Sequence, residues 1–177
     1  MLTIKDLFDL DHTIAKDYLA RFTYPWEALA GIQDFILSVG PTLKDYDEVA
    51  PHVWVHKTAV VAPTAYLGAP CIIGPETEVR HCAFIRGSAL VGAGSITSNV
   101  KSDKLPVVVR CGAERMDTGR KKVGAMLGDF VEVGCNSVLN PGAVIGRHTR
   151  IYPLSSVRGT VPENGIYKRS GDIAAQR

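Results

Sequence analysis

The chain has 177 residues, of which 46% are hydrophobic, which is enough for one domain or for one domain with a small appendage. Its formal net charge is only +2 at pH 7, which argues against nucleic acid as a main partner, because a basic stripe would raise the balance much further. No apolar run is long enough to cross a membrane and the N-terminus has no long apolar stretch, so we expect a cytoplasmic protein.

Residues 1–53 are predicted to form a helical segment. Asp11 can cap a first short helix, and a second helix over 26–39 is bracketed by Pro25 and Gly40. We expect these helices to cap the open end of the structure that follows, with partner binding or locking of an oligomer as the alternative. The apolar stripe of the second helix consists of Trp26, Leu29, Ile32, Phe35 and Ile36.

Thirteen six-residue repeats, all in one phase, fill the segment 54–162 outside an interruption at 98–126. Each repeat begins with an apolar residue and has a small residue four places later, with Val131 and Val161 as the exceptions. A period of six fits neither a helix nor a strand of ordinary length and therefore indicates a stacked solenoid. The leading residues are Val55, Val61, Leu67, Ile73, Val79, Ile85, Val91, Leu127, Val133, Leu139, Ile145, Ile151 and Val157.

Three such repeats would close a triangular coil, so that each residue lies under the one 18 places later. Small residues such as Ala59, Thr77 and Ser95 would fill the narrow axis, and the rungs would lie about 4.8 Å apart, as in any sheet. The predicted stacked pairs are Val55 with Ile73, Leu67 with Ile85, Leu127 with Ile145 and Val133 with Ile151.

The residue after the leading apolar one is often glycine or asparagine. Both types tolerate positive φ, which we expect the tight corners of the coil to require. This structural role would account for most of the 17 glycines without any phosphate-binding loop. The residues at this position are Gly68, Gly74, Gly92, Gly128, Gly134, Asn140 and Gly146.

The interruption at 98–126 is predicted to be a protruding hairpin arm. A β-rich run over 105–110 and a polar partner over 114–122 flank Cys111 and Gly112. Because excursions from a solenoid often collect on its binding face, the basic residues of this arm indicate either a solvated surface or an anion site. These residues are Lys101, Lys104, Arg110, Arg115, Arg120, Lys121 and Lys122.

Residues 163–177 are expected to be a polar tail that frays. The four cysteines have no C-x-x-C spacing, and we expect them to be reduced thiols. Cys71 falls in the row of small residues above Ala89, so it should point inward and pack as a small apolar side chain.

The runs VGAGSITSN at 91–99, GDFVEVG at 128–134 and NPGAVIG at 140–146 resemble the acetyltransferase half of bifunctional sugar-1-phosphate nucleotidyltransferase/acetyltransferases. The resemblance covers about 55–162, and GRKKVGA at 119–125 extends it through the arm to the archaeal members. It implies a left-handed parallel β-helix, a homotrimer with acetyl-CoA between neighbouring prisms, and N-acetylation of an amino-sugar 1-phosphate in nucleotide-sugar synthesis. The chain shows no glycine-rich nucleotidyltransferase signature, so we do not expect the uridylating half in it.

The same resemblance assigns roles to individual residues. Arg80 matches a sugar-phosphate ligand, and a guanidinium suits that role because it pairs with phosphate by charge-assisted hydrogen bonds. Asn99 matches a residue that contacts the sugar. We assign Lys101 of the arm to substrate binding together with Arg80 and Asn99. The cofactor-binding set that the resemblance implies is Gly134, Cys135, Arg120, Lys121 and Lys122.

This chain departs most from the family pattern at the catalytic base. It is a histidine followed three residues on by tyrosine and five on by glycine, and this chain lacks that spacing. Relatives carry about two further coils between Val91 and Ala93, where the base should lie. The nearest substitute is His81, which the 18-residue rule places beneath Asn99 and next to Arg80, where a neutral imidazole could accept the proton of the amine.

Two alternatives to an active acetyltransferase are considered. One is a non-catalytic trimeric hexapeptide-repeat domain that has lost the base but binds a ligand. The other is a metal-dependent hydratase, which needs three converging imidazoles, and the five histidines do not share a face at ligand spacing. We therefore expect no metal in the site and acetyl-CoA as the co-substrate.

Overall fold

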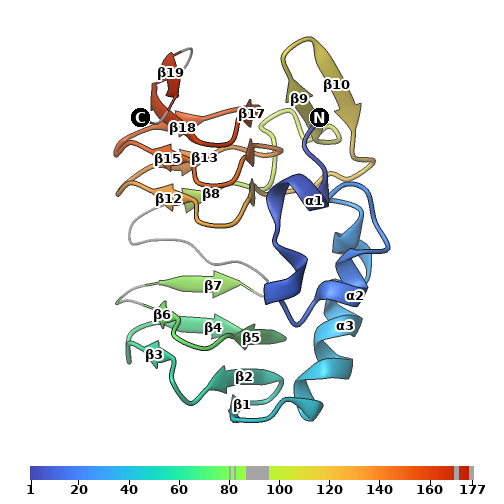
Figure 1. Cartoon of the computed structure of the whole chain (residues 1–177), viewed down its shortest axis with the longest axis vertical. Coiled ribbons are helices and arrows are strands. Elements are labelled where there is room, and N and C mark those ends of the chain that lie inside the picture. Colours follow the sequence, from blue (N-terminus) through green and yellow to red (C-terminus); the bar gives the residue numbers. More distant parts are fainter. Residues whose placement is uncertain (80, 82, 87–95, 170–171, 176–177) are drawn as a thin grey trace. The chain divides into compact units, whose positions relative to one another are not determined.

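The computed structural model describes residues 1–79, 81, 83–86, 96–169 and 172–175. The chain forms two compact units, unit 1 from Met1–Ala28 with Gly94–Arg177, and unit 2 from Leu29–Ala93. Within each unit, short parallel strands are stacked coil on coil (Figure 1). The fold class predicted from the repeats, a left-handed parallel β-helix with an N-terminal helical segment, is confirmed.

The helices before the coils are shorter than predicted. The predicted start of the helix over 26–39 is wrong, since only the last eight residues of this segment are α-helical. The chain passes from unit 1 to unit 2 between Ala28 and Leu29, before this helix begins. Asp11 does not cap α2, whose N-cap is Ala15. The helices are α1 (Ile4–Leu7), α2 (Lys16–Leu19) and α3 (Ile32–Val39), with 3₁₀ turns η1 (Leu10–His12), η2 (Ala28–Ala30) and η3 (Gly40–Thr42). None of these described helices has the length and hydropathy to cross a membrane.

A strand, not a helix, covers the outer edge of the first rung in unit 2. Strand β1 (Tyr46–Ala50) pairs antiparallel with β2 (Val53–His56) and satisfies its backbone groups. The segment 1–28 packs elsewhere, since Leu7 and Trp26 are buried in unit 1 with Val107 from the arm and Val144 from a coil. The expected capping role of the N-terminal helices is therefore wrong for this edge.

Unit 2 confirms the 18-residue stacking. Its parallel pairs align Val55 with Ile73 and Leu67 with Ile85. Cys71 is buried as predicted, and burial raises the pKa of its thiol. Besides β1 and β2, the strands are β3 (Val60–Val61), β4 (Tyr66–Gly68), β5 (Cys71–Ile73), β6 (Glu78–Val79) and β7 (Phe84–Arg86).

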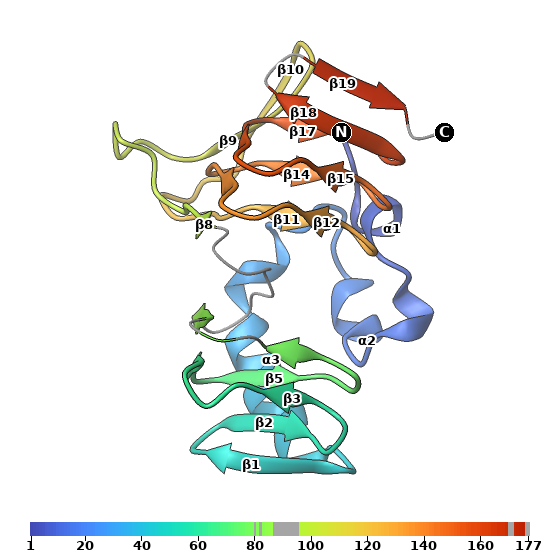
Figure 2. The ribbon, with the colours of Figure 1, turned by 90° about the vertical axis from the view of Figure 1, so that its left-hand side faces the viewer.

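Unit 1 contains three stacked faces whose rungs follow one another in Figure 2. The first face is β11-β14-β17, the second β12-β15-β18-β19 and the third β8-β13-β16. Leu127 lies beside Ile145 and Val133 beside Ile151, as predicted. The strands are β8 (Ile96–Thr97), β11 (Met126–Leu127), β12 (Glu132–Val133), β13 (Val138–Leu139), β14 (Val144–Ile145), β15 (Arg150–Ile151), β16 (Ser156–Val157), β17 (Thr160–Val161), β18 (Gly165–Arg169) and β19 (Asp172–Ala175).

The last coil of unit 1 is two residues shorter than the rule predicts. Val161 pairs with Ile145 and Tyr167 with Ile151, at a separation of 16 residues. Val161 is therefore the leading apolar residue of a face rather than an exception in the small row. The shortening falls at the corner that contains Gly159, whose φ of +72° allows a tighter turn.

The segment after 162 corrects the expectation of a fraying tail. Strand β18 pairs in parallel with β15 and buries Tyr167 in the core of the coils. Strand β19 then pairs antiparallel with β18 and covers its edge. The polar composition of this segment concealed the strand, because its outer side chains face solvent.

The structural reason for glycine after the leading residues differs from the one predicted. The positive φ angles lie two residues later, mostly at non-glycine residues such as Phe130 and His148. The glycines are needed for space, since a Cβ on Gly134 would lie 2.4 Å from the backbone N of Pro153, and one on Gly146 2.4 Å from that of Glu163. In unit 1 the following coil thus passes directly over Gly134 and Gly146.

We predict that Gly146→Ala lowers the free energy of unfolding by about 1–3 kcal/mol, because the backbone of the next coil must move. Gly124→Ala is the matched control, since its Cβ would meet nothing closer than Asn99 Cβ at 4.0 Å, and its effect should stay within about 1 kcal/mol of zero. Chemical denaturation measures both. Equal stability of the two variants would contradict the stacking.

Candidate anion-binding site

The structure confirms the hairpin predicted for the arm, 98–126. Strands β9 (Val108–Cys111) and β10 (Glu114–Asp117) pair antiparallel around Gly112, whose φ is +57° (Figure 1). The arm interrupts the third face, because Ile96 of β8 still pairs with Val138 of β13 although 42 residues separate them. The coils on either side of the arm therefore keep their register.

The arm packs on the corner between the third and first faces. Gly142 and Gly159 occupy this corner with φ angles of +74° and +72°. A Cβ on Gly142 would lie 2.8 Å from Cγ1 of Val107, so a side chain there would push the arm away. The Thr160 hydroxyl also donates a hydrogen bond of 2.8 Å to the carbonyl of Arg110. These contacts fix the base of the arm against the coils.

A cavity of about 450 Å³ lies between the arm and this corner, within the range of small-molecule sites. Its two sides come from segments far apart in the sequence. It is lined by Ser98, Val100, Lys101, Ser102, Asp103, Val108, Arg110, Asn140, Pro141, Gly142, Arg158 and Gly159.

The cations of this cavity are only partly neutralised. Lys101 Nζ lies 2.9 Å from Asp103 Oδ2 and 3.4 Å from the carbonyl of Pro106. Within the described residues, the guanidinium groups of Arg110 and Arg158 form no ion pair and no hydrogen bond. Two exposed, planar guanidinium groups at one cavity attract an anion that offers pairs of acceptor oxygens, as phosphate does.

Two acceptor groups share the cavity with these cations. Asp103 Oδ1 accepts a hydrogen bond of 3.0 Å from the Leu105 N–H, and the hydrogen bond from Lys101 is the largest cause of the lowered pKa of Asp103. Asn140 is buried, and its Nδ2 donates to Ser156 Oγ at 3.0 Å and to the Val157 carbonyl at 2.9 Å. Because a backbone carbonyl can only accept, Nδ2 must face it, and Oδ1 remains as the acceptor.

The substrate-binding residues predicted from the sequence are only partly brought together. Lys101 lines the cavity, and Asn99 lies at the base of the arm, where its carbonyl accepts from the Val123 N–H at 3.0 Å. Arg80 lies outside the described residues. His81 belongs to unit 2, is exposed, and its Nδ1 lies 2.9 Å from the hydroxyl of Thr64. The expected stacking of His81 beneath Asn99 stays a prediction.

The predicted cofactor residues do not line the cavity. Gly134 and Cys135 lie at the corner between the second and third faces, where Cys135 is exposed and its carbonyl accepts from Leu154 N–H at 3.0 Å. Lys121 and Lys122 are exposed on the returning part of the arm, and the carbonyl of Arg120 accepts from Val107 N–H at 2.8 Å. Among the residues with described positions, no three His, Cys, Asp or Glu side chains could hold a metal ion together.

Three cavity residues were missed as site candidates: Asp103, Asn140 and Arg158. The stacking rule contained a signal for one of them, because Arg158 lies 18 places after Asn140 and thus on the same corner. No sequence signal showed which corner the arm would contact.

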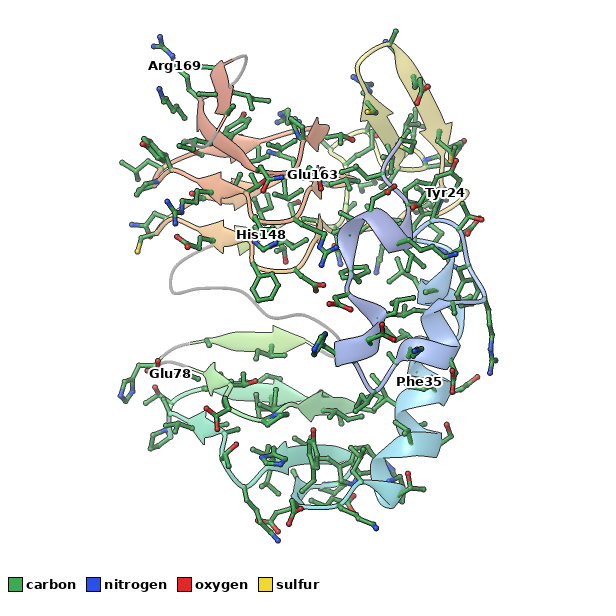
Figure 3. All side chains as sticks on the ribbon, viewed as in Figure 1. Tyr24, Phe35, Glu78, His148, Glu163 and Arg169 are labelled. Carbon is green, nitrogen blue, oxygen red and sulfur yellow. The ribbon has the colours of Figure 1, made fainter. Side chains whose placement is uncertain are left out.

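We predict that Arg158→Gln weakens the binding of inorganic phosphate about three- to tenfold, since one charge-assisted pair at an exposed site is lost. Arg169→Gln is the control, because this arginine pairs with Asp172 and lies on the opposite side of unit 1 from the β9–β10 hairpin (Figure 3). Calorimetric titration measures the dissociation constants. An unchanged constant in the Arg158 variant would show that phosphate does not occupy this cavity.

No protein-family profile matches the chain. It is 30% identical over 102 residues to a bifunctional sugar-1-phosphate nucleotidylyltransferase/acetyltransferase of Sulfurisphaera tokodaii, a match that covers 55% of this chain and 25% of the relative. It is also 30% identical over 122 residues to the uncharacterized acetyltransferase YaiX of Escherichia coli, covering 66% of this chain and 50% of the relative. The bifunctional protein GlmU of Prochlorococcus marinus is 24% identical over 159 residues, which covers 87% of this chain and 30% of the relative.

The chain thus spans between a quarter and a half of the length of these curated relatives. The similarity and the β-helix agree with the resemblance seen in the repeats. The chain is a hexapeptide-repeat domain similar to the C-terminal acetyltransferase part of bifunctional sugar-1-phosphate nucleotidylyltransferase/acetyltransferases.

Proposed function

We propose that the chain is an acyl-CoA-dependent acetyltransferase that acetylates the amino group of an amino-sugar 1-phosphate in nucleotide-sugar synthesis. The observation that carries the proposal is the cavity with Arg110 and Arg158, whose guanidinium groups have no partner among the described residues, on a β-helix related to acetyltransferases. These two residues and Lys101 would hold the phosphate of the substrate. Fixing the phosphate places the amine at a defined distance from it, and such positioning lowers the barrier of a bimolecular reaction.

The reaction needs a base. The ammonium group of the bound substrate first loses one proton to solvent. The nitrogen of the resulting neutral amine then attacks the thioester carbonyl of acetyl-CoA, the C–N bond forms and the C–S bond breaks. The nitrogen loses a proton to the base, and the thiolate of CoA takes up a proton. We assign the base to His81, because a Thr64 hydroxyl that accepts from Nδ1–H would leave Nε2 unprotonated and exposed for this task.

The remaining assignments follow the family resemblance. Arg80 and Asn99 would contact the sugar phosphate, and Gly134 and Cys135 would contact acetyl-CoA. Arg120, Lys121 and Lys122 would meet phosphate groups of the cofactor. The exposed position of Cys135 and of both lysines is compatible with ligands that arrive from solvent or from a neighbouring copy in a homotrimer. A cytoplasmic location would supply acetyl-CoA.

A second candidate function is ligand binding without turnover. The ionisable residues that line the cavity are Lys101, Asp103, Arg110 and Arg158, so the described wall of the cavity offers no imidazole. A domain that keeps the anion site but lacks a base next to the amine would bind sugar phosphate and leave it unchanged.

We predict thiol release from acetyl-CoA in the presence of glucosamine 1-phosphate, and a drop of about 10²–10⁴-fold in kcat for His81→Asn, because the general base is removed. His52→Asn in the same unit is the control, since His52 is exposed, has a φ of +61° that asparagine tolerates, and should have no effect. Binding of the sugar phosphate without thiol release would favour the second candidate. Full activity in the His81 variant would refute the assignment of the base.

A further inference from the structure

We infer that the cavity is selective for a zwitterionic ligand, a phosphate ester that also carries a protonated amine, and that Asp103 is the residue that recognises the amine. The inference rests on the proposed function, because it concerns the substrate of the same site. It starts from the presence of both charge signs in one cavity. Arg110 and Arg158 have no partners within the described chain, and Asp103 lines the same cavity.

A wholly basic cavity would bind phosphate esters with little discrimination. A carboxylate in that cavity repels a second anionic group and attracts an ammonium group, so it changes which phosphate ester binds best. Lys101 already pairs with Asp103, but an ionised carboxylate has about four lone-pair sites, and the structure uses one for Lys101 and one for Leu105. Acceptor sites therefore remain for a ligand.

The position of Asp103 is fixed before a ligand arrives. Its Oδ1 accepts from the N–H two residues later, a turn that holds the side chain in one orientation. Its side chain is 48% exposed, so the carboxylate can be reached from outside the protein. A preoriented acceptor loses less conformational entropy on binding than a free side chain does.

Asn140 also lines the cavity, and the orientation of its side-chain amide is fixed. Both of its Nδ2 hydrogens are used, one by Ser156 and one by the Val157 carbonyl, and Oδ1 has no partner among the described residues. A protonated amine brings three N–H donors. The residues that line the cavity therefore include a charged acceptor, Asp103, a neutral amide, Asn140, and two guanidinium groups for the phosphate.

This arrangement also separates substrate from product. Acetylation turns the ammonium form of the free substrate into a neutral amide with a single N–H, which can no longer pair electrostatically with Asp103. The product keeps its contacts with the guanidinium groups but loses this attraction. The same carboxylate that selects the substrate would then favour release of the product.

The test is calorimetric titration at mildly acidic pH, where the amine is protonated, with glucosamine 1-phosphate, glucose 1-phosphate and N-acetylglucosamine 1-phosphate. The unchanged protein should bind glucosamine 1-phosphate about fivefold more tightly than the other two, which corresponds to about 1 kcal/mol for one partly exposed ion pair. Asp103→Asn should abolish this preference and leave glucose 1-phosphate bound at least as well as before, because an amide oxygen can still accept from Leu105 while Lys101 is released.

Asp117→Asn is the matched control. Asp117 accepts from the N–H two residues later in the same way as Asp103, at 2.8 Å, but it lies on β10 and does not line the cavity. This variant should keep the fivefold preference. Retained binding of inorganic phosphate by the Asp103 variant shows that the cavity is still folded.

The outcomes separate the inference from the proposed function. Equal binding of the aminated and the hydroxylated sugar phosphate by the unchanged protein, or a preference that survives Asp103→Asn, overturns the inference while the anion site stands. If neither sugar phosphate nor inorganic phosphate binds to the unchanged protein, the anion site itself is wrong, and the inference fails with it.

Discussion

The hydrogen bonds between successive coils are the constraint on which the rest of this structure depends. In unit 1 the N–H of Gly128, Gly134 and Asn140 donates to a carbonyl 17 residues later, at 2.8–3.0 Å. These bonds hold the backbones of adjacent coils so close that a Cβ on Gly134 or Gly146 would meet the backbone of the next coil, and the inward residues must be small. Ser137 and Thr149 are such residues, and their hydroxyls donate to backbone carbonyls.

Among the described residues of unit 1, a cavity large enough for a small ligand lies where this tight repeat is interrupted. The arm leaves and rejoins the coils between β8 and β11, and it packs on a corner with Gly142 and Gly159, while other corners of unit 1 carry Phe130, His148 or Leu154 in the same left-handed conformation. The cavity exists because the arm stands against this corner rather than inside the coil. The same packing places Lys101, Asp103 and Arg110 of the arm in one cavity with Arg158 of the coil, so the cavity contains both positive and negative side chains.

The periodicity predicted the coils because the leading apolar residues with described positions are buried or partly buried by the same stacking, and Leu139 and Ile145 show this with no exposed surface. The hairpin was predictable from its β-rich run around Gly112. The path of 26–39 was not, because Trp26 and Ile36 share a helical period although they are buried in different units. The cavity could not be derived either, since Asp103 acquires its neighbours through the packing of the arm on one of three equivalent corners, and no period encodes that choice.

The central claim is that Arg110 of the arm and Arg158 of the coil, which line the same cavity, hold the phosphate of the ligand. A crystal structure of the protein with bound glucosamine 1-phosphate tests it most directly. The account predicts a phosphate group within hydrogen-bond distance of both guanidinium groups, with the amine on the side of Asp103. A phosphate bound instead at the corner of Gly134 and Cys135, with the cavity beside the arm filled only by water, would contradict it.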